Sequence, residues 1–199
     1  MDFQTLTTYI FLFISLYLEI FFLVTYVENR GSIKKESLKK ELLFYPSVTI
    51  IVPCYNEEET IAGTLLSILR LDYPREKVKI FVVNDGSTDH TASVLRRFEK
   101  NKQITIFHKE NGGKHTAINL ALSHAKTDLI GCLDADSFVA KDALKNIVTY
   151  FEDRQVMSVV PSIVVQNPSN IIQFIQKVEY NWGVFLRKIL SCMGAIYIT

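Results

Sequence analysis

The chain has 199 residues, with 22 Lys and Arg against 21 Asp and Glu, so its formal net charge is +1. A near-neutral chain of this length leaves room for one domain plus an attachment and gives no indication of nucleic-acid binding. The three cysteines are odd in number and widely spaced, which argues against a disulfide framework and against a zinc site.

Residues 8–27 form an apolar segment with one charge, Glu19, and have about the length that crosses a bilayer as a helix. No Lys or Arg precedes this segment, whereas five follow it: Arg30, Lys34, Lys35, Lys39 and Lys40. The positive-inside rule then predicts an anchor in the cell (plasma) membrane, with the amino terminus outside and the chain after about residue 28 in the cytoplasm. Glu19 would be costly facing lipid, so either it is tolerated there by protonation or snorkelling, or it faces another membrane helix.

Residues 1–45 are therefore expected to form the anchor and a basic juxtamembrane segment, and residues 46–199 a second domain. Short apolar runs alternate there with helical periodicity, which predicts an α/β, doubly wound domain with a mostly parallel sheet. We expect strands at 48–52, 79–83, 104–107, 129–133 and 156–165, and helices at 57–71, 91–100, 114–124 and 140–151. An aromatic and partly basic helix at 170–190 either lies against the membrane surface or the anchor helix, or is a core helix.

Two carboxylates, Asp134 and Asp136, follow the apolar run 129–133. Side chains two positions apart in a strand share a face, so both carboxylates are expected on the same side. Hard oxygen ligands of this kind suit Mg²⁺ or Mn²⁺, and such ions commonly hold substrate phosphates as well. The alternative is an acidic turn followed by the N-cap of the next helix.

Polar residues also follow the first two predicted strands, in the segments 53–57 and 84–89. Ligands of open α/β sheets bind beyond the carboxyl ends of the strands. Helix caps and turns could explain single residues there, but carboxylates gathered at three neighbouring strand ends repel one another unless they serve a cation or a ligand. Gly112 and Gly113 precede a predicted helix and permit close approach of an anion, and Lys114 would then face a phosphate; a generic glycine-rich turn is the alternative.

Four segments, VPCYNEEETI, VVNDGSTDHT, NGGKHTAINLAL and CLDADS, occur in this order. Together they resemble the family-2 glycosyltransferases, which have the GT-A fold, and the resemblance covers about residues 46–199. The chain is most similar to the membrane-anchored branch that includes the poly-N-acetylglucosamine, hyaluronan, chitin and cellulose synthases. The resemblance implies an inverting, metal-dependent enzyme that transfers a sugar from a nucleotide-sugar, expected to be a UDP-sugar, to a growing polysaccharide or glycan. The alternatives are transfer of one sugar to a polyprenyl-phosphate lipid carrier, and a non-catalytic nucleotide-sugar-binding membrane protein.

The resemblance also implies roles for individual residues. Donor binding falls to Tyr55, Glu57, Asp85, Lys114, Asn119 and Asp134. The first three would contact the base and ribose, Lys114 would lie near the diphosphate, and Asn119 would support its loop. Asp136 would be the more direct ligand of Mg²⁺ or Mn²⁺, with Asp134 beside it near the sugar or ribose. The family's acidic general-base motif and its QxxRW motif do not occur before Thr199. The base is therefore expected beyond Thr199, and this length of chain alone is expected to be inactive.

Overall fold

The computed structural model describes residues 2–36, 42, 44–165 and 168–192. Its contacts divide the chain into two compact units. Residues 40–159 form one unit, and residues 1–39 together with 160–199 form the other.

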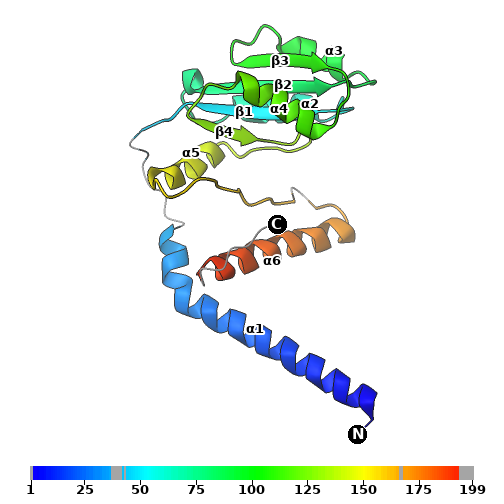
Figure 1. The fold of residues 1–199 in the computed structure, drawn as a ribbon, viewed down its shortest axis with the longest axis vertical. Coiled ribbons are helices and arrows are strands. Elements are labelled where there is room, and N and C mark those ends of the chain that lie inside the picture. The colour runs from blue at the N-terminus through cyan, green and yellow to red at the C-terminus, as the bar shows by residue number, and fades with distance from the viewer. Residues whose placement is uncertain (1, 37–41, 43, 166–167, 193–199) are drawn as a thin grey trace. The chain divides into compact units, whose positions relative to one another are not determined.

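The unit 40–159 is built on a four-stranded parallel sheet in the order β3-β2-β1-β4 (Figure 1). Its strands are β1 (Val48–Cys54), β2 (Val78–Asp85), β3 (Ile104–Lys109) and β4 (Leu129–Cys132). The chain steps from β1 through β2 to β3 on one side and then returns to place β4 on the other side of β1. The strand order therefore reverses between β1 and β4, which is the place where open α/β sheets bind ligands.

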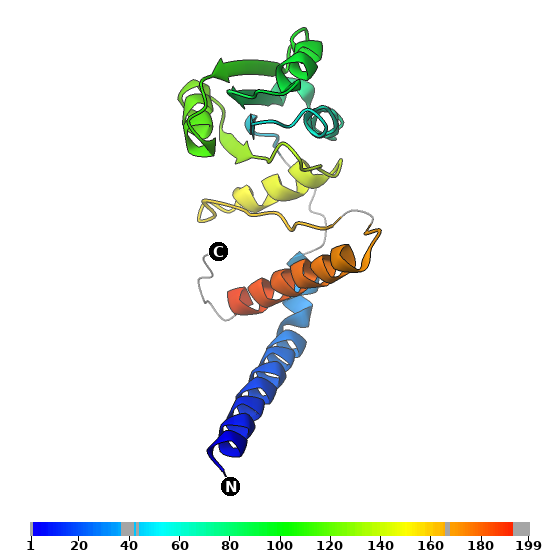
Figure 2. The ribbon, with the colours of Figure 1, turned by 90° about the vertical axis from the view of Figure 1, so that its right-hand side faces the viewer.

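Helices cover both faces of this sheet (Figure 2). On one face, α2 (Ile61–Leu69), α3 (Thr91–Leu95) and α5 (Ala143–Val148) bury their apolar side chains against β1 and β2. On the other face, α4 (Lys114–His124) packs two fully buried alanines, Ala117 and Ala121, against Ile51, Phe81 and Val83. Because β1 is covered on both sides, all seven of its residues are buried, which explains its unbroken apolar sequence. The predicted doubly wound α/β domain is confirmed.

Three helices, α2, α3 and α5, are shorter than the periodicity predicts, whereas α4 has the predicted bounds. α2 begins at Ile61 rather than at residue 57, because residues 55–60 form a loop that bonds to the neighbouring loop after β2. Tighter 3₁₀ turns follow α3 and α5, at Arg96–Phe98 and Thr149–Glu152, and a third occurs at Arg75–Lys77.

The strand predicted at 156–165 does not form. These residues form neither a helix nor a strand, and β4 pairs only with β1 among the described strands. An apolar run becomes a strand only when another strand supplies its hydrogen-bond partners, and sequence periodicity carries no information about that partner.

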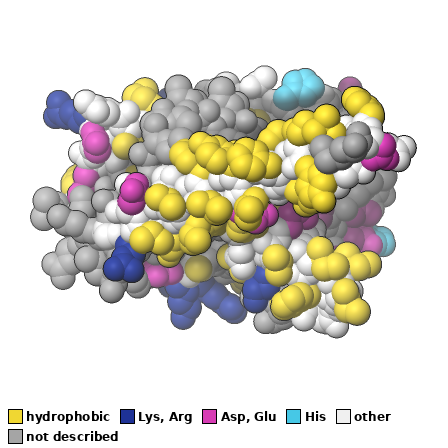
Figure 3. Space-filling model, turned by 90° about the horizontal axis from the view of Figure 1, so that it is seen from below, with side chains coloured by type: hydrophobic (Ala, Val, Ile, Leu, Met, Phe, Trp, Pro, Cys, Tyr) yellow, Lys and Arg dark blue, Asp and Glu magenta, His cyan; other side chains and the backbone are white. Residues whose placement is uncertain are grey.

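In the second unit, the described residues form two helices, α1 (Phe3–Glu36) and α6 (Ile171–Cys192). By length and composition, α1 is able to cross a membrane over Phe3–Gly31, and none of its most apolar stretch is buried. Many large hydrophobic side chains of α1 are accordingly exposed. Figure 3 shows a face of the molecule on which hydrophobic side chains gather. The two helices touch through the rings of Tyr26 and Phe185, whose centroids are 5.3 Å apart, and Trp182 stacks on Phe185. Glu19, which was predicted to be tolerated in lipid or to face another membrane helix, is exposed on α1.

Candidate functional site

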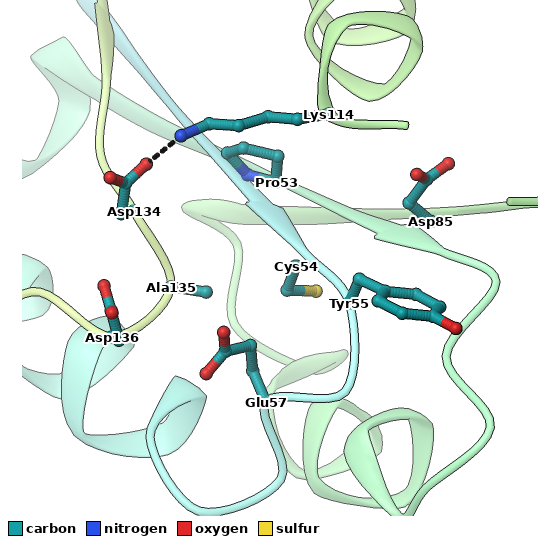
Figure 4. Close-up of a pocket in the computed structure, with 9 residues that line it drawn as sticks. All are labelled: Pro53, Cys54, Tyr55, Glu57, Asp85, Lys114, Asp134, Ala135 and Asp136. Atoms are coloured by element: carbon teal, nitrogen blue, oxygen red, sulfur yellow. Dashed lines mark hydrogen bonds and ion pairs between the residues drawn. The ribbon is translucent and has the colours of Figure 1, made fainter. Parts of the chain in front are cut away.

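A pocket of about 240 Å³ opens at the carboxyl ends of the strands, beside the reversal of strand order (Figure 4). It brings together six of the seven residues predicted from sequence: Tyr55, Glu57, Asp85, Lys114, Asp134 and Asp136. Pro53, Cys54 and Ala135 complete its lining. The seventh predicted residue, Asn119, is exposed on α4 and does not line this pocket.

Asp85 is the last residue of β2 and is 4% exposed. Its Oδ1 accepts hydrogen bonds from the ammonium of Lys109 and from the amide of Gly112, 3.1 Å away. Its Oδ2 accepts a bond of 2.9 Å from the amide of Gly113. The two glycine amides were predicted to receive an anion, and the anion that they bind in the structure is this carboxylate.

Two glycines allow the loop before α4 to come this close. Gly86 has φ +73°, and a Cβ there would lie 2.6 Å from the backbone nitrogen of Asn111, so the two loops touch backbone to backbone. Gly113 has φ +88° and directs the chain into α4. Residues other than glycine rarely adopt a positive φ, so the backbone conformation favours glycine at both positions.

Opposing effects act on the Asp85 carboxyl group. Its burial disfavours the charged form, but the bonds from Lys109, Gly112 and Gly113 outweigh that penalty and hold its pKa below the ordinary value. A carboxylate offers about four lone-pair sites, and three are occupied by these donors. Asp85 can therefore accept one further hydrogen bond from a ligand in the pocket.

Lys114, the first residue of α4, reaches across the pocket and pairs with the Oδ1 of Asp134 (Figure 4). The hydrogen bond to Asp134 raises the pKa of the Lys114 ammonium group, so it stays charged at neutral pH. The two side chains are 59% and 57% exposed, which leaves both accessible to an entering ligand.

Asp134 and Asp136 lie on the loop after β4 and not within the strand, which ends at Cys132. Between them, Ala135 is buried, while both carboxylate residues are exposed. Residues 134–136 are called the acidic turn below. This turn brings both carboxylates to the pocket. They lie beyond the end of β4, so the alternation of side chains along a strand, on which the sequence prediction relied, does not apply to them.

The donor set of the acidic turn fits a hard divalent cation. The described residues contain no group of three or more His, Cys, Asp or Glu side chains able to hold a metal. Mg²⁺ usually takes one or two protein carboxylates and completes its shell with water and substrate phosphate. Two exposed carboxylates beside a pocket that also holds a lysine match this pattern, with phosphate oxygens as the remaining ligands.

A network of hydrogen bonds joins the loop after β1 to the loop after β2. The amide of Glu57 donates to the Thr91 hydroxyl at 2.8 Å, and the amide of Glu58 donates to Asp89 at 3.2 Å. Asn56 is bonded in both directions, donating from its amide to Ser87 and accepting from the amide of Thr88. A helix cap would have been a simpler role for a residue of the segment 53–57. In the structure, the hydrogen bonds of Asn56 instead connect the two loops and so hold Glu57 at the pocket.

Cys54 is the one lining residue with a thiol, a group that in other enzymes acts as a nucleophile. Its thiol is buried, and this burial, followed by the negative charge of Glu57, raises its pKa to about 12. Thiolate is the reactive form of cysteine, so at neutral pH Cys54 is an inert, neutral side chain.

Three residues of this region were missed by sequence reasoning: Lys109, Thr91 and Thr64. Lys109 was detectable in principle, because it ends β3 where Asp85 ends β2, and the register pairs the two residues directly. Thr91 and Thr64 are fully buried and act on backbone groups of other loops, at 2.8 and 2.7 Å respectively. Such contacts depend on how the helices dock, and neither residue carries a local sequence signal for them.

Comparison with known proteins links this geometry to a family. The sequence profile described as Glycosyl transferase family 2 matches residues 49–190. The poly-beta-1,6-N-acetyl-D-glucosamine synthase of Staphylococcus aureus (strain COL) is 38% identical over 135 residues, which cover 67% of this chain and 32% of that protein. The synthase of the same name from Staphylococcus epidermidis is 34% identical over 145 residues, covering 72% and 35%.

Among solved structures, a mannosyltransferase, PcManGT from Pyrobaculum calidifontis in complex with GDP-Man and Mn²⁺, superposes with a TM-score of 0.55. It is 34% identical and covers 72% of this chain and 44% of its own. The chain thus spans about a third of the length of the curated relatives that it matches. The profile match takes in every pocket residue from Pro53 to Asp136 and extends over well more than half of the chain, so the chain belongs to glycosyl transferase family 2.

Proposed function

We propose that the protein is a membrane-bound glycosyltransferase that moves a sugar from a UDP-sugar to a growing polysaccharide, by an inverting and metal-dependent reaction. The observation that carries this proposal is the pocket itself, where one lysine and four carboxylates gather at the strand-order reversal. The relatives support a nucleotide-sugar donor and a polysaccharide product: two are synthases of poly-beta-1,6-N-acetyl-D-glucosamine, and PcManGT was solved with GDP-Man and Mn²⁺.

The donor is proposed to lie across the pocket with its nucleoside toward β2 and its diphosphate toward α4. Tyr55 offers an exposed ring for the base, while Glu57 and the free acceptor site of Asp85 can bind ribose hydroxyls or a base N–H. Lys114 would bind the diphosphate. The helix dipole stabilises an anion at the start of a helix, and the Lys114 ammonium group lies at the start of α4. Asn119 is proposed to act only through the position of α4.

Asp136 and Asp134 would hold Mg²⁺ or Mn²⁺ at the diphosphate end. A bound ion of this kind supplies Lewis-acid stabilisation of the charge on the departing nucleoside diphosphate. Lys114 adds a second positive charge at the same place, which favours departure of the leaving group. An inverting reaction also needs a general base that takes the proton of the acceptor hydroxyl.

The anchor and its orientation are part of the proposal. α1 is long enough to cross the hydrocarbon core, since 34 residues of helix extend about 50 Å against a core of about 30 Å. The charge asymmetry of its flanks would place the unit 40–159 in the cytoplasm, where nucleotide-sugars are available.

The proposal is tested by replacing Asp136 with Asn in the detergent-purified protein. We expect Mn²⁺-dependent binding of UDP, measured by calorimetry, to weaken about tenfold or more, because the cation loses a charged ligand. Asp153→Asn is the matched control, since Asp153 is an exposed carboxylate outside the pocket. Equal Mn²⁺ dependence in wild type and Asp136→Asn would refute the metal assignment. Analysis of the product, polymer or lipid-linked monosaccharide, decides between the proposed acceptor and a lipid carrier.

A further inference from the structure

α2 is bonded directly to the acidic turn. Thr64, in the middle of α2, is fully buried, and its hydroxyl donates a hydrogen bond of 2.7 Å to the backbone carbonyl of Ala135. Ala135 is the residue between the two carboxylates (Figure 4). This bond therefore fixes the peptide plane between Ala135 and Asp136, in the middle of the acidic turn.

The Thr64 hydroxyl had another acceptor available. Within a helix, threonine usually bonds back to the carbonyl four residues earlier, and here that group is Thr60 at 3.4 Å. A hydroxyl has one proton to donate, and the much shorter distance to Ala135 shows where it goes. The bond therefore serves the turn and leaves the helix itself little changed.

Two neighbouring residues of α2 hold the segment that follows the turn. Ser67, one turn along from Thr64, accepts a hydrogen bond of 3.2 Å from the amide of Val139. Gly63 lies under the ring of Phe138, and a Cβ at Gly63 would come within 2.7 Å of that ring. The acidic turn and the residues after it are thus attached to α2 at three successive places.

α2 is a rigid support for these contacts. Ile61, Leu65 and Ile68, on the same buried face of the helix as Thr64, are all packed in the hydrophobic core. A side chain on a helix that is packed in the core keeps a nearly fixed position, whereas a loop without such contacts moves more freely. The acidic turn consequently takes its position from the core through α2.

From these contacts we infer that Thr64 is a positioning residue for donor binding: it sets the geometry in which Asp134 and Asp136 hold a divalent cation. This inference rests on the proposed function, in which the acidic turn binds Mg²⁺ or Mn²⁺ together with the donor diphosphate. Thr64 itself touches neither the cation nor the donor, because its hydroxyl is buried under the turn.

The test uses the isosteric change Thr64→Val in the full, detergent-purified chain, with Mn²⁺ and UDP as probes. Loss of the hydroxyl leaves the Ala135 carbonyl buried without a partner, and the turn can relieve this only by moving. We expect the apparent Mn²⁺ affinity in the presence of UDP to fall roughly tenfold. Binding of uridine without metal should change by less than about twofold, because the nucleoside end of the pocket is untouched. Thr64→Ser, which keeps the hydroxyl, should restore the Mn²⁺ affinity.

Thr49→Val provides a matched control. Thr49 is also fully buried and also uses its hydroxyl, 2.7 Å from that of Thr127, but it lies near the amino end of β1. Five residues of strand place it roughly 17 Å from Cys54 at the pocket. This variant should lose stability and keep its Mn²⁺ affinity.

Equal Mn²⁺ affinities in Thr64→Val, Thr49→Val and wild type would overturn the inference. If Thr64→Val does not fold, Ser67→Ala replaces it, because Ser67 is only half-buried; it should weaken Mn²⁺ binding several-fold, and an unchanged affinity would also overturn the inference. Failure of the proposed function would give a different result. Wild type would then show no Mn²⁺-dependent binding of UDP, or Asp136→Asn would retain that binding, and the inference about Thr64 would be refuted as well.

Discussion

Replacement of Asp85 by Asn tests how the pocket is held together. In the wild type, three donors point at the carboxylate: the ammonium of Lys109 and the amides of Gly112 and Gly113. Asparagine has the same shape but only one acceptor oxygen, and its NH₂ group would face at least one of these donors. The substitution therefore breaks one charge-assisted hydrogen bond and weakens the others without creating a cavity.

The size of the effect follows from the kind of bond that is lost. A hydrogen bond to a charged, buried group contributes about 1.5–3 kcal/mol, and we take about 2 kcal/mol for Asp85→Asn. Since about 1.4 kcal/mol corresponds to a factor of ten, local opening of the loop before α4 should become about 30 times more frequent. Amides released by that opening should exchange with solvent faster by a comparable factor.

Hydrogen–deuterium exchange with mass spectrometry reads this directly in peptides that cover residues 110–117. Asp128→Asn is the matched control, because Asp128 also binds a backbone amide, that of Ser47 at 2.8 Å, outside the pocket. Exchange around Ser47 should rise in the control while residues 110–117 stay as in wild type. Unchanged exchange of residues 110–117 in Asp85→Asn would refute the role of Asp85 as the holder of the glycine loop.

The pH dependence of the unfolding temperature, compared between wild type and Asp85→Asn, provides a second measurement. The pKa of Asp85 is lowered in the folded state, so its stabilising contribution is present above the unfolded value, about 3.9, and is lost as pH falls through the lower folded value. The unfolding temperature of Asp85→Asn should lie about 8 °C below that of wild type at pH 7, and the difference should shrink below about pH 4. A difference that stays constant down to pH 3 would show that the charge of Asp85 is not what stabilises the loop.

Two further predictions concern the ligand and the membrane. Lys114→Ala should weaken binding of UDP about tenfold and binding of uridine by less than about twofold in calorimetric titrations, because the partner of Lys114 is phosphate; an equal loss for both ligands would contradict this assignment. A reporter enzyme fused after Thr199 should be active in the cytoplasm, as the positive charges after α1 predict, and activity only outside the cell would reject the proposed orientation.

The sheet was predictable because its strands are covered on both faces. β1 and β2 are buried along nearly their whole length, so their sequences are continuous apolar runs that end at polar residues. Those polar ends also revealed the site, since parallel strands bring their carboxyl ends to one edge. The sequence alone therefore predicts that Asp85, Asp134 and Asp136 lie at this edge, and the pocket brings them together.

What sequence could not supply was the pairing between distant segments. The sequence predicts a nucleotide as a partner of Asp85, but it does not reveal that Lys109 and two glycine amides also bond to this carboxylate. The support of the acidic turn by Thr64 links residues 71 positions apart, and it depends on the docking of α2. The strand predicted at 156–165 failed for the same reason, because pairing depends on a neighbour that the run itself does not specify.

The two ion pairs of the pocket differ in a way that bears on donor entry. The Lys109–Asp85 pair is mostly buried and is reinforced by two backbone amides, so breaking it would leave a buried carboxylate without its counter-charge. The Lys114–Asp134 pair is more than half exposed, and pairs of that kind contribute only about 0–1 kcal/mol. In the proposed reaction, a diphosphate that arrives with its cation offers a new partner to each member of this weak pair: phosphate for Lys114 and the metal for Asp134. The exchange replaces one exposed ion pair by two charge-assisted contacts, so the two residues that pair with each other in the structure can bind the donor without disturbing the loop that Asp85 holds.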